Sequence, residues 1–480
     1  MAKKFYVTSP IFYPNARPHL GHAYTATLCD IFARYHRAQG DATYFLTGTD
    51  ENTGKVVKAA AAAGKDLPAF LDEITANFKV LHAALGISYD QFIRTTDQKQ
   101  HWPGAQKMWQ KLVEAGDIYK HEYEGLYCRE CEAFYTEKDL IGGKCPIHGI
   151  VAEKIKEQNY FFRLSKYTDQ IKNVISSGEL AIVPETRRNE ILALLERGLE
   201  DVSFSRPKGV VPHGIPVPGD SEQVIYVWCD ALVNYISALG YGSVDESTFK
   251  KFWPADMHII GKDILRFHAA IWPAMLLSAG LPLPKSIFVH GFILSGGKKM
   301  SKSLGNVIDP ADLIAEYGAE AVRYYFAREI SPFEDGELTV ETFKAAYNAN
   351  LANGLGNLVS RVMKMATVNG VVFDSKSGGS VAKNIAKHYQ EAFAEYNIKM
   401  AMDLVWGIVA AADQSIQTNQ PFKKIKEDRP AAEKNIKELL ADLALIATLL
   451  GPIMPETAKK IAACVSDNKM PEEALFLRKE

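Results

Sequence analysis

The sequence has few cysteines, almost no net charge and no long apolar run. Its 480 residues include 6 cysteines, too few for a disulfide framework in a chain of this length. The 55 basic and 57 acidic residues give a net charge of −2, which excludes a globally basic nucleic-acid binder. No run reaches transmembrane length, and residues 1–7 lack the apolar stretch of a signal peptide. We therefore expect a cytoplasmic protein without membrane contact, in which local basic patches make any RNA contact.

The remaining composition is that of a globular protein, with 47% hydrophobic residues, and its length predicts two to four domains. A β-prone run at 5–8, helical spacing over 21–36 and a second β-prone run at 42–46 form a βαβ pattern. Further strands are predicted at 224–228, 258–260 and 287–290. This alternation predicts an α/β, Rossmann-like domain whose ligands bind where parallel strands end.

The patterns also predict how the chain is divided. A segment rich in charge, proline and cysteine looks like an insertion that splits the α/β domain, and strand signals vanish after about residue 345. Amphipathic stretches at 345–366, 382–417 and 431–450, with a helix after Pro455, predict a C-terminal α-helical bundle. The expected segments are 1–114 and 221–290 for the α/β domain, 115–220 for the insertion, 291–345 for a linker region and 346–480 for the bundle.

The most informative motif is Lys299-Met300-Ser301-Lys302-Ser303, in a loop bounded by glycines. Two lysines and serine hydroxyls on such a loop can hold a polyphosphate through charge and hydrogen bonds. Its alternative interpretation is a solvated lysine turn.

Near the N-terminus, His19-Leu20-Gly21-His22 opens the first predicted helix. Imidazole donors at a helix start add to the dipole that already favours an anion there. The alternative is a pair of surface or capping histidines. The two motifs together predict phosphate chemistry.

A third motif has the spacing of a metal site. Cys128 and Cys131 are followed after thirteen residues by Cys145, and then by His148. Two short ligand turns of this kind predict a tetrahedral zinc site, and four protein ligands leave no open position for catalysis. We therefore expect one structural Zn²⁺ inside the insertion; the alternative is three unrelated thiols and a surface histidine.

These motifs, with the segments at 9–15, 48–51, 226–231 and 261–268, resemble the methionyl-tRNA synthetase family of class I aminoacyl-tRNA synthetases over essentially the whole chain. The resemblance implies methionine activation by ATP with Mg²⁺ and transfer to tRNA(Met). It implies that His19, His22, Lys299 and Lys302 are catalytic. The expected ATP contacts are these four with Gly21, Lys262, Asp263 and Ser301.

By the same resemblance, Asp50 would hold the substrate α-ammonium and Arg206 its carboxylate or the phosphates. An aromatic-rich pocket suits a thioether, because sulfur gains from aromatic edges. The alternative is that these aromatic residues are ordinary core. The residues expected to line the side-chain pocket are Ile11, Tyr13, Trp228, Ala231, Leu232, Tyr235, Ile264, His268 and Trp272.

In the predicted bundle, Asn353, Asn357 and Arg361 follow one another at helical spacing, and amides and guanidinium groups suit base edges. Their segment resembles the family's anticodon-reading helix; the alternative is a polar face with Arg361 in a salt bridge. Phe422 stands where many relatives carry tryptophan and would stack on the anticodon.

The sequence also departs from the family pattern. Glu51, Asn52 and Thr53 follow Asp50 where relatives often place a histidine, and the chain ends at Glu480 without the module that dimerises some relatives. A monomer is therefore expected. Leucyl, isoleucyl and valyl enzymes carry a larger insertion, and the cysteinyl enzyme places zinc beside its substrate. A non-catalytic tRNA-binding paralogue would have no use for the two phosphate motifs.

Overall fold

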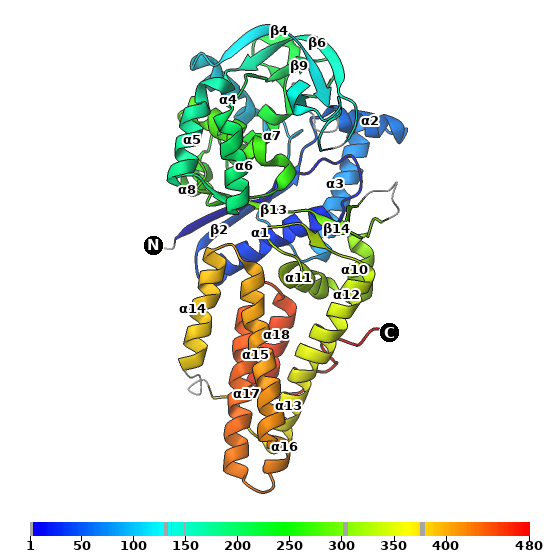
Figure 1. Cartoon of the computed structure of the whole chain (residues 1–480), viewed down its shortest axis with the longest axis vertical. Helices are drawn as coiled ribbons and strands as arrows, with labels where there is room; N and C mark the ends of the chain where they lie inside the picture. The colour runs from blue at the N-terminus through cyan, green and yellow to red at the C-terminus, as the bar shows by residue number, and fades with distance from the viewer. Residues whose placement is uncertain (1–2, 129–132, 136, 148, 301–305, 375–379) are drawn as a thin grey trace. The chain divides into compact units, whose positions relative to one another are not determined.

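The computed structural model describes the whole chain except residues 1–2, 129–132, 136, 148, 301–305 and 375–379 (Figure 1). The chain divides into two compact units. Unit 1 comprises Met1–Pro18, Gly40–Ala83 and Ser88–His290, and unit 2 comprises His19–Gln39, Ala84–Ile87 and Gly291–Glu480. The first helix, α1 (Leu20–Ala38), therefore belongs to the unit that also contains the helical bundle.

Unit 1 is built around a parallel sheet, as the βαβ pattern predicts. Within the described residues its order is β3-β2-β1-β12-β13-β7, and all neighbouring pairs are parallel. Apolar side chains on these strands are buried on both faces, which is typical of a sheet covered by helices. The strands are β1 (Lys4–Thr8), β2 (Ala42–Thr49), β3 (Gln91–Arg94), β7 (Ala181–Val183), β12 (Met257–Gly261) and β13 (Ser286–His290).

One local prediction in unit 1 differs from the structure. The strand expected at 224–228 is β11 (Asp220–Ile225), which pairs with β9 (Ser205–Pro207) and β10 (Pro216–Val217) outside the main sheet. Trp228 instead lies in helix α7 (Val227–Ser237), whose residues are all buried. A fully buried apolar run has no periodicity that separates helix from strand, and this caused the error.

The segment 115–220, which is expected to be an insertion, also supplies one strand of the main parallel sheet. Its own sheet has the order β5-β4-β6-β8 and is dominated by β4 (Ile118–Cys128) and β6 (Glu153–Phe162), which pair antiparallel along ten register positions. Strand β7 then pairs with β13 as an edge of the parallel sheet, between helices α5 (Thr168–Ser177) and α6 (Glu185–Glu196). The remaining strands of the inserted sheet are β5 (Ala133–Tyr135) and β8 (Val202–Ser203).

The other helices of unit 1 bury two apolar clusters. Helix α4 contacts α7 and α9, and α8 contacts β1. Together they bury one large apolar cluster that includes Trp109, Tyr235 and Trp272. Helices α4 (Trp102–Glu114), α8 (Ser247–Phe252) and α9 (Trp272–Ser278) contribute to this cluster. Helices α2 (Gly54–Ala62) and α3 (Leu67–Ala84) bury a separate, smaller cluster with Phe12.

Unit 2 carries the predicted helical bundle, in which α17 contacts α13, α15, α16 and α18 (Figure 1). The stretch expected as one helix over 382–417 is two helices. The break falls at Tyr396, which has a φ of +61°, and the Asn397 side chain then caps the next helix at the Met400 N–H, 3.0 Å away. The bundle helices are α13 (Asn357–Asn369), α14 (Ser380–Ala394), α15 (Ile398–Asn419), α16 (Pro421–Lys424), α17 (Arg429–Leu450) and α18 (Pro455–Asp467).

Candidate functional site

The strand ends of unit 1 bring the first predicted loops together. The Phe12 N–H donates to the Gly48 carbonyl at 2.9 Å, and the Asp50 N–H donates to the Phe12 carbonyl at 2.8 Å. These bonds hold the loop after β1, with Ile11 and Tyr13, against the loop after β2, with buried Asp50. The arrangement places Asp50 at the carboxyl edge of the sheet, where α/β proteins bind ligands.

Most residues predicted to line the side-chain pocket belong to one large apolar cluster in unit 1 or pack against it. Trp228 lies flat on Phe267 with ring centroids 3.6 Å apart. The cluster includes or is directly packed by Ile11, Tyr13, Trp228, Ala231, Leu232, Tyr235, Ile264 and Trp272. The structure therefore gathers these residues, although the alternative of ordinary core describes the same packing.

His268 supplies the polar contact of this cluster, and its environment defines its tautomer. Its Nδ1 lies 3.0 Å from the Ile264 carbonyl and its Nε2 lies 2.7 Å from the Tyr235 hydroxyl. Since a carbonyl only accepts, Nδ1 carries the proton and the Tyr235 hydroxyl donates to Nε2. Burial lowers the pKa of His268 to about 4, so the ring is neutral at pH 7. It lies in a π-helical turn (Phe267–Ile271), a feature frequent at functional sites.

His258 is a second buried histidine, and it forms hydrogen bonds with Trp272 and Thr8. The Trp272 indole N–H donates to His258 Nε2 at 3.3 Å, so His258 Nδ1 holds the proton that it donates to Thr8 Oγ1 at 2.7 Å. Burial lowers the pKa of His258 well below its usual value, and the nearby His268 lowers it further. Both imidazoles are therefore neutral hydrogen-bonding groups that orient aromatic rings.

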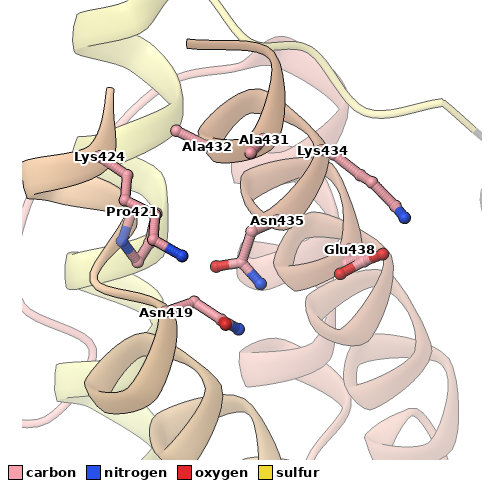
Figure 2. Close-up of a pocket in the computed structure, with 8 residues that line it drawn as sticks. All are labelled: Asn419, Pro421, Lys424, Ala431, Ala432, Lys434, Asn435 and Glu438. Carbon is pink, nitrogen blue, oxygen red and sulfur yellow. The ribbon is translucent and has the colours of Figure 1, made fainter. Parts of the chain in front are cut away.

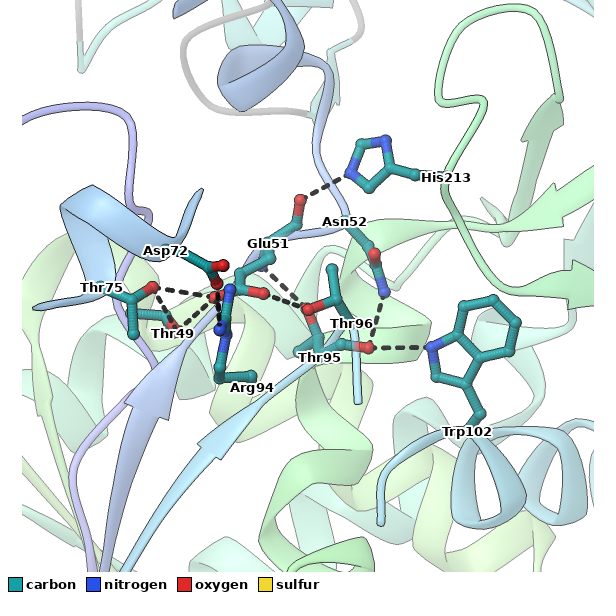
Figure 3. A network of polar contacts seen from close by, with 10 residues as sticks. All are labelled: Thr49, Glu51, Asn52, Asp72, Thr75, Arg94, Thr95, Thr96, Trp102 and His213. Atoms are coloured by element: carbon teal, nitrogen blue, oxygen red, sulfur yellow. Dashed lines mark hydrogen bonds and ion pairs between the residues drawn. The ribbon is translucent and has the colours of Figure 1, made fainter. Parts of the chain in front are cut away.

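Next to Asp50, the buried Glu51 carboxylate organises a polar network that the sequence did not reveal (Figure 3). Its Oε1 accepts from Arg94 Nε at 2.7 Å and from the hydroxyls of Thr49 and Thr75 at 2.9 and 3.0 Å. The Thr96 hydroxyl donates to Oε2. Because hydrogen bonds to a charged acceptor are stronger than neutral ones, this network fixes the backbone beside Asp50.

Asn52 links the same loop to the helix that carries Trp228. Its amide nitrogen donates to Asp230 Oδ2 at 2.8 Å and to the Thr95 carbonyl at 3.0 Å. Asp230 also bonds His101 Nε2, and His101 Nδ1 lies 2.8 Å from Ser237 Oγ. All of these side chains are buried. The only sequence signal was the polar run after β2; its partners lie 43 to 178 residues away.

In unit 2, the two motif histidines cap α1. His19 Nδ1 accepts from the Gly21 N–H at 3.0 Å, and His22 Nδ1 accepts from the His19 N–H at 3.2 Å. Their rings stack with centroids 3.8 Å apart. An imidazole that accepts at Nδ1 holds its proton on Nε2 when neutral, so both rings present Nε2–H donors. A Cβ on residue 21 would lie 2.8 Å from His19 Cε1, which explains the glycine.

The lysine motif begins in a short hairpin of unit 2. Strand β14 (Ile293–Ser295) pairs with β15 (Lys298–Lys299), and Gly296 and Gly297 make the turn with φ of +64° and +68°. The Glu337 carboxylate accepts from their N–H groups at 2.5 and 3.1 Å. Lys299 Nζ lies over the Phe292 ring at 4.6 Å. Ser301 and Lys302 lie outside the described residues.

Three further residues, Lys262, Asp263 and Arg206, are predicted to bind the nucleotide or the methionine carboxylate. Lys262 and Asp263 follow β12 at its carboxyl end, the edge expected for ligand binding. Arg206 lies on β9, where its Nη1 is 3.1 Å from Glu157 Oε2 and its guanidinium covers the Tyr127 ring at 4.2 Å. Both contacts of Arg206 are with residues of the inserted sheet rather than with the residues predicted to line the side-chain pocket.

Two predicted zinc ligands lie together. Cys128 and Cys145 are buried in a small cluster with Tyr135. Cys128 pairs with Ala133 where β4 and β5 lie side by side, and the Cys145 carbonyl accepts from the Gly149 N–H at 2.8 Å. No metal-binding group of three side chains occurs among the described residues, which omit the other two predicted ligands, Cys131 and His148.

The predicted anticodon residues lie on the bundle. Asn353 and Asn357 are exposed, and Arg361 forms an ion pair with Asp413, as the alternative interpretation expected. Asn353 falls in the π-helical segment Tyr347–Gly356, so α-helical spacing relates only the other two. Phe422 on α16 is 47% exposed, which leaves its ring accessible to a base.

Comparison with known proteins gives a consistent result. The family model described as tRNA synthetases class I (M) matches residues 5–153 and 137–363, and the anticodon binding domain of methionyl tRNA ligase matches 377–475. Methionine--tRNA ligases of Clostridium acetobutylicum and Caldanaerobacter subterraneus are each 43% identical over 96% of this chain and 73% and 74% of their own lengths.

The fold agrees with the sequence comparison. A Mycobacterium tuberculosis methionyl-tRNA synthetase in complex with methionyl-adenylate superposes with a TM-score of 0.90, at 37% identity, over 99% of this chain and 98% of that one. The apo form of the same organism's enzyme has a TM-score of 0.84. The chain therefore belongs to the methionyl-tRNA synthetase family of class I aminoacyl-tRNA synthetases.

Proposed function

We propose that the protein is a methionine–tRNA ligase. It activates methionine with ATP to methionyl-adenylate and pyrophosphate, and then transfers the methionyl group to the 3′-terminal adenosine of tRNA(Met) for translation initiation and elongation. The observation that carries this proposal is the apolar, aromatic cluster around Tyr235 and His268, in the unit whose parallel sheet carries buried Asp50 at its carboxyl edge. A related enzyme 37% identical over nearly the whole chain binds methionyl-adenylate, which supports the same assignment.

The proposed roles follow from the chemistry of each group. Asp50 holds the α-ammonium group of methionine, which orients the methionine carboxylate for in-line attack on the α-phosphate of ATP. The Nε2–H groups of His19 and His22 donate to phosphate oxygens, and Lys299 and Lys302 hold the departing pyrophosphate as cations. The nucleotide would bring a Mg²⁺ ion, which would supply positive charge against the phosphate oxygens. The enzyme contributes no covalent bond.

ATP–pyrophosphate exchange with a panel of amino acids tests the activation step. We expect exchange with methionine that is lost in Lys302→Ala and His22→Ala, while Lys298→Ala, an exposed lysine in the same hairpin, retains it. Exchange driven by leucine or cysteine would refute methionine specificity. No exchange with any amino acid would favour a tRNA-binding protein without catalysis.

We propose one structural Zn²⁺ held by Cys128, Cys131, Cys145 and His148. The burial of two thiols in one cluster fits tetrahedral sulfur-rich coordination. Elemental analysis of purified protein should find one zinc per chain, and Cys145→Ser should lower it. Cys464→Ser, a buried thiol in unit 2, is the matched control. Wild-type protein without zinc would refute the site.

For tRNA recognition we propose that Asn353, Asn357, Arg361 and Phe422 contact the anticodon. Asn357→Ala should raise the KM for tRNA in charging, and the matched change at an exposed bundle position, Gln414→Ala, should not. Equal effects of the two changes would contradict the assignment.

The assembly state and the cellular compartment stay predictions, a monomer in the cytoplasm. Sedimentation velocity and cell fractionation would measure them. Among the described residues, no helix combines the length and apolar character that a bilayer-spanning segment needs.

A further inference from the structure

Three buried side chains join the two parts of unit 1 that are proposed to hold methionine. Asn52 lies two residues after Asp50, in the loop that follows β2. Asp230 lies two residues after Trp228, in helix α7. His101, which immediately precedes α4, is the third member. None of the three is more than 2% exposed, so they influence a substrate only through the residues beside them.

Both oxygens of the Asp230 carboxylate are held by this network. The Asn52 amide nitrogen donates to Oδ2 at 2.8 Å, and His101 Nε2 donates to Oδ1. The other ring nitrogen of His101, Nδ1, lies 2.8 Å from Ser237 Oγ. His101 therefore contacts α7 at two points that are about two helical turns apart. Because hydrogen bonds are stronger in a buried, low-dielectric site than in water, these contacts fix the rotation and the axial position of α7.

The network contacts the side of α7 that is opposite the predicted pocket. At 3.6 residues per turn, Asp230 and Ser237 share one face of the helix. Trp228 and Tyr235, which are predicted to line the pocket, share the opposite face. Close packing of α4 supports the same alignment, because a Cβ on Gly104 would lie 2.6 Å from Ser237 Cβ. The network therefore holds α7 from behind, and it ties the helix to the loop that carries the proposed ammonium-binding carboxylate.

We propose that Asn52, His101 and Asp230 are positioning residues that fix the separation between Asp50 and the aromatic face of α7, and thereby select the length of the amino-acid side chain. The proposal rests on the methionine-activating function above. An apolar pocket with a fixed wall distinguishes substrates that differ by one methylene by about 10- to 200-fold. If the wall can move, the longer substrate is accommodated and this factor falls.

ATP–pyrophosphate exchange gives kcat/KM for methionine and for ethionine, whose side chain is longer by one methylene. The ratio of the two values measures selection by length and does not depend on the fraction of enzyme that is folded, so a poorly folding variant still gives an answer. Asp230→Ala and His101→Ala should each lower this ratio about tenfold. Asp117→Ala removes another buried carboxylate of unit 1, which is bound by Lys166 and Ser278, and should leave the ratio unchanged.

Two further comparisons separate the network from general damage. His101→Gln keeps a donor for Asp230 and should retain more of the wild-type ratio than His101→Ala does. Asn52→Ala should lower the ratio, whereas Asn435→Ala should not, because Asn435 lines a small pocket between α16 and α17 in unit 2 (Figure 2). Both asparagine side chains are buried, so the two changes are matched.

Because Asp230 and His101 act in one network, the double variant Asp230→Ala/His101→Ala should lower the ratio no further than either single change. An unchanged ratio in the single variants, an equal fall in Asp117→Ala, or additive losses in the double variant would overturn the proposal. Wild-type enzyme that activates methionine while its variants keep the ratio refutes the positioning role alone. Wild-type enzyme without methionine-dependent exchange refutes the proposed function.

Discussion

Among single residues, Glu51 should matter more than its surface counterpart Asp72, because both bind Arg94 and only Glu51 is buried. Glu51→Gln should lower the free energy of unfolding by about 2 kcal/mol, since a buried charged acceptor is lost. It should also raise the KM for methionine, because the neighbouring Asp50 loop loosens. Asp72→Asn should cost less than about 1 kcal/mol. Urea unfolding and exchange kinetics measure both; equal losses would contradict the network.

His268 gives a second prediction at this scale. Its pKa is about 4 in the folded protein and near 6.5 in an unfolded chain, so the unfolded state takes up the proton first. Stability should be complete above about pH 6.5 and should fall toward pH 4, where this residue has lost about 3 kcal/mol. His268→Gln should reduce the pH dependence of the free energy of unfolding in that window to the part that His258 contributes. His388→Gln, an exposed control, should leave it unchanged.

Among the elements, the start of α1 depends on Gly21. Gly21→Ala would push the His19 ring out of its cap, because the new Cβ would lie 2.8 Å from His19 Cε1. A displacement of about 1 Å can cost about 100-fold in rate, so exchange should fall by about that factor. Gly407→Ala in α15 meets no atom within 4 Å and should raise stability by up to about 1 kcal/mol without slowing exchange. Unchanged exchange in Gly21→Ala would contradict the cap.

The β14–β15 hairpin gives the second prediction for an element. Glu337→Gln removes the charge that binds the Gly296 and Gly297 N–H groups, so the turn should open more often. Faster amide exchange at both glycines and a lower kcat for adenylate formation are expected. Glu334→Gln, an exposed neighbour, should change neither. A lower kcat without faster amide exchange would mean that the carboxylate acts by another route.

For the whole molecule, buried Arg323 holds unit 2 together. Its guanidinium bonds Asp30 of α1 at 2.7 Å, and donates to the Ile453 and Leu85 carbonyls at 2.6 and 3.3 Å. Arg323→Met would remove one of the two arginines that pair with buried Asp30, the other being Arg34, and should cost about 3–5 kcal/mol. Arg328→Met on the same helix removes a more exposed pair and should cost about 1 kcal/mol or less. Similar unfolding curves for the two variants would contradict this role.

The same scale shows what the sequence can reveal. Strands β1, β2, β12 and β13 and the helix start at His19 were predictable, because local periodicity and short spacings encode them. Strand β7 was missed because three residues in a charged segment carry no local signal, and its pairing with β13 is set by the whole fold. The Asn52–Asp230–His101 network was missed for the same reason: its members are distant in sequence and ordinary in type.

Finally, because Trp228 stacks on Phe267, the intrinsic fluorescence of Trp228 should report on ligand binding in this cluster. The chain has 6 tryptophans, and the Trp228 indole N–H has no hydrogen-bond partner among the described residues. Its emission wavelength should respond when a ligand changes the polarity around it. Amino-acid binding can then be followed without a label, with Trp228→Phe, which keeps the other tryptophans, as the reference that lacks this signal.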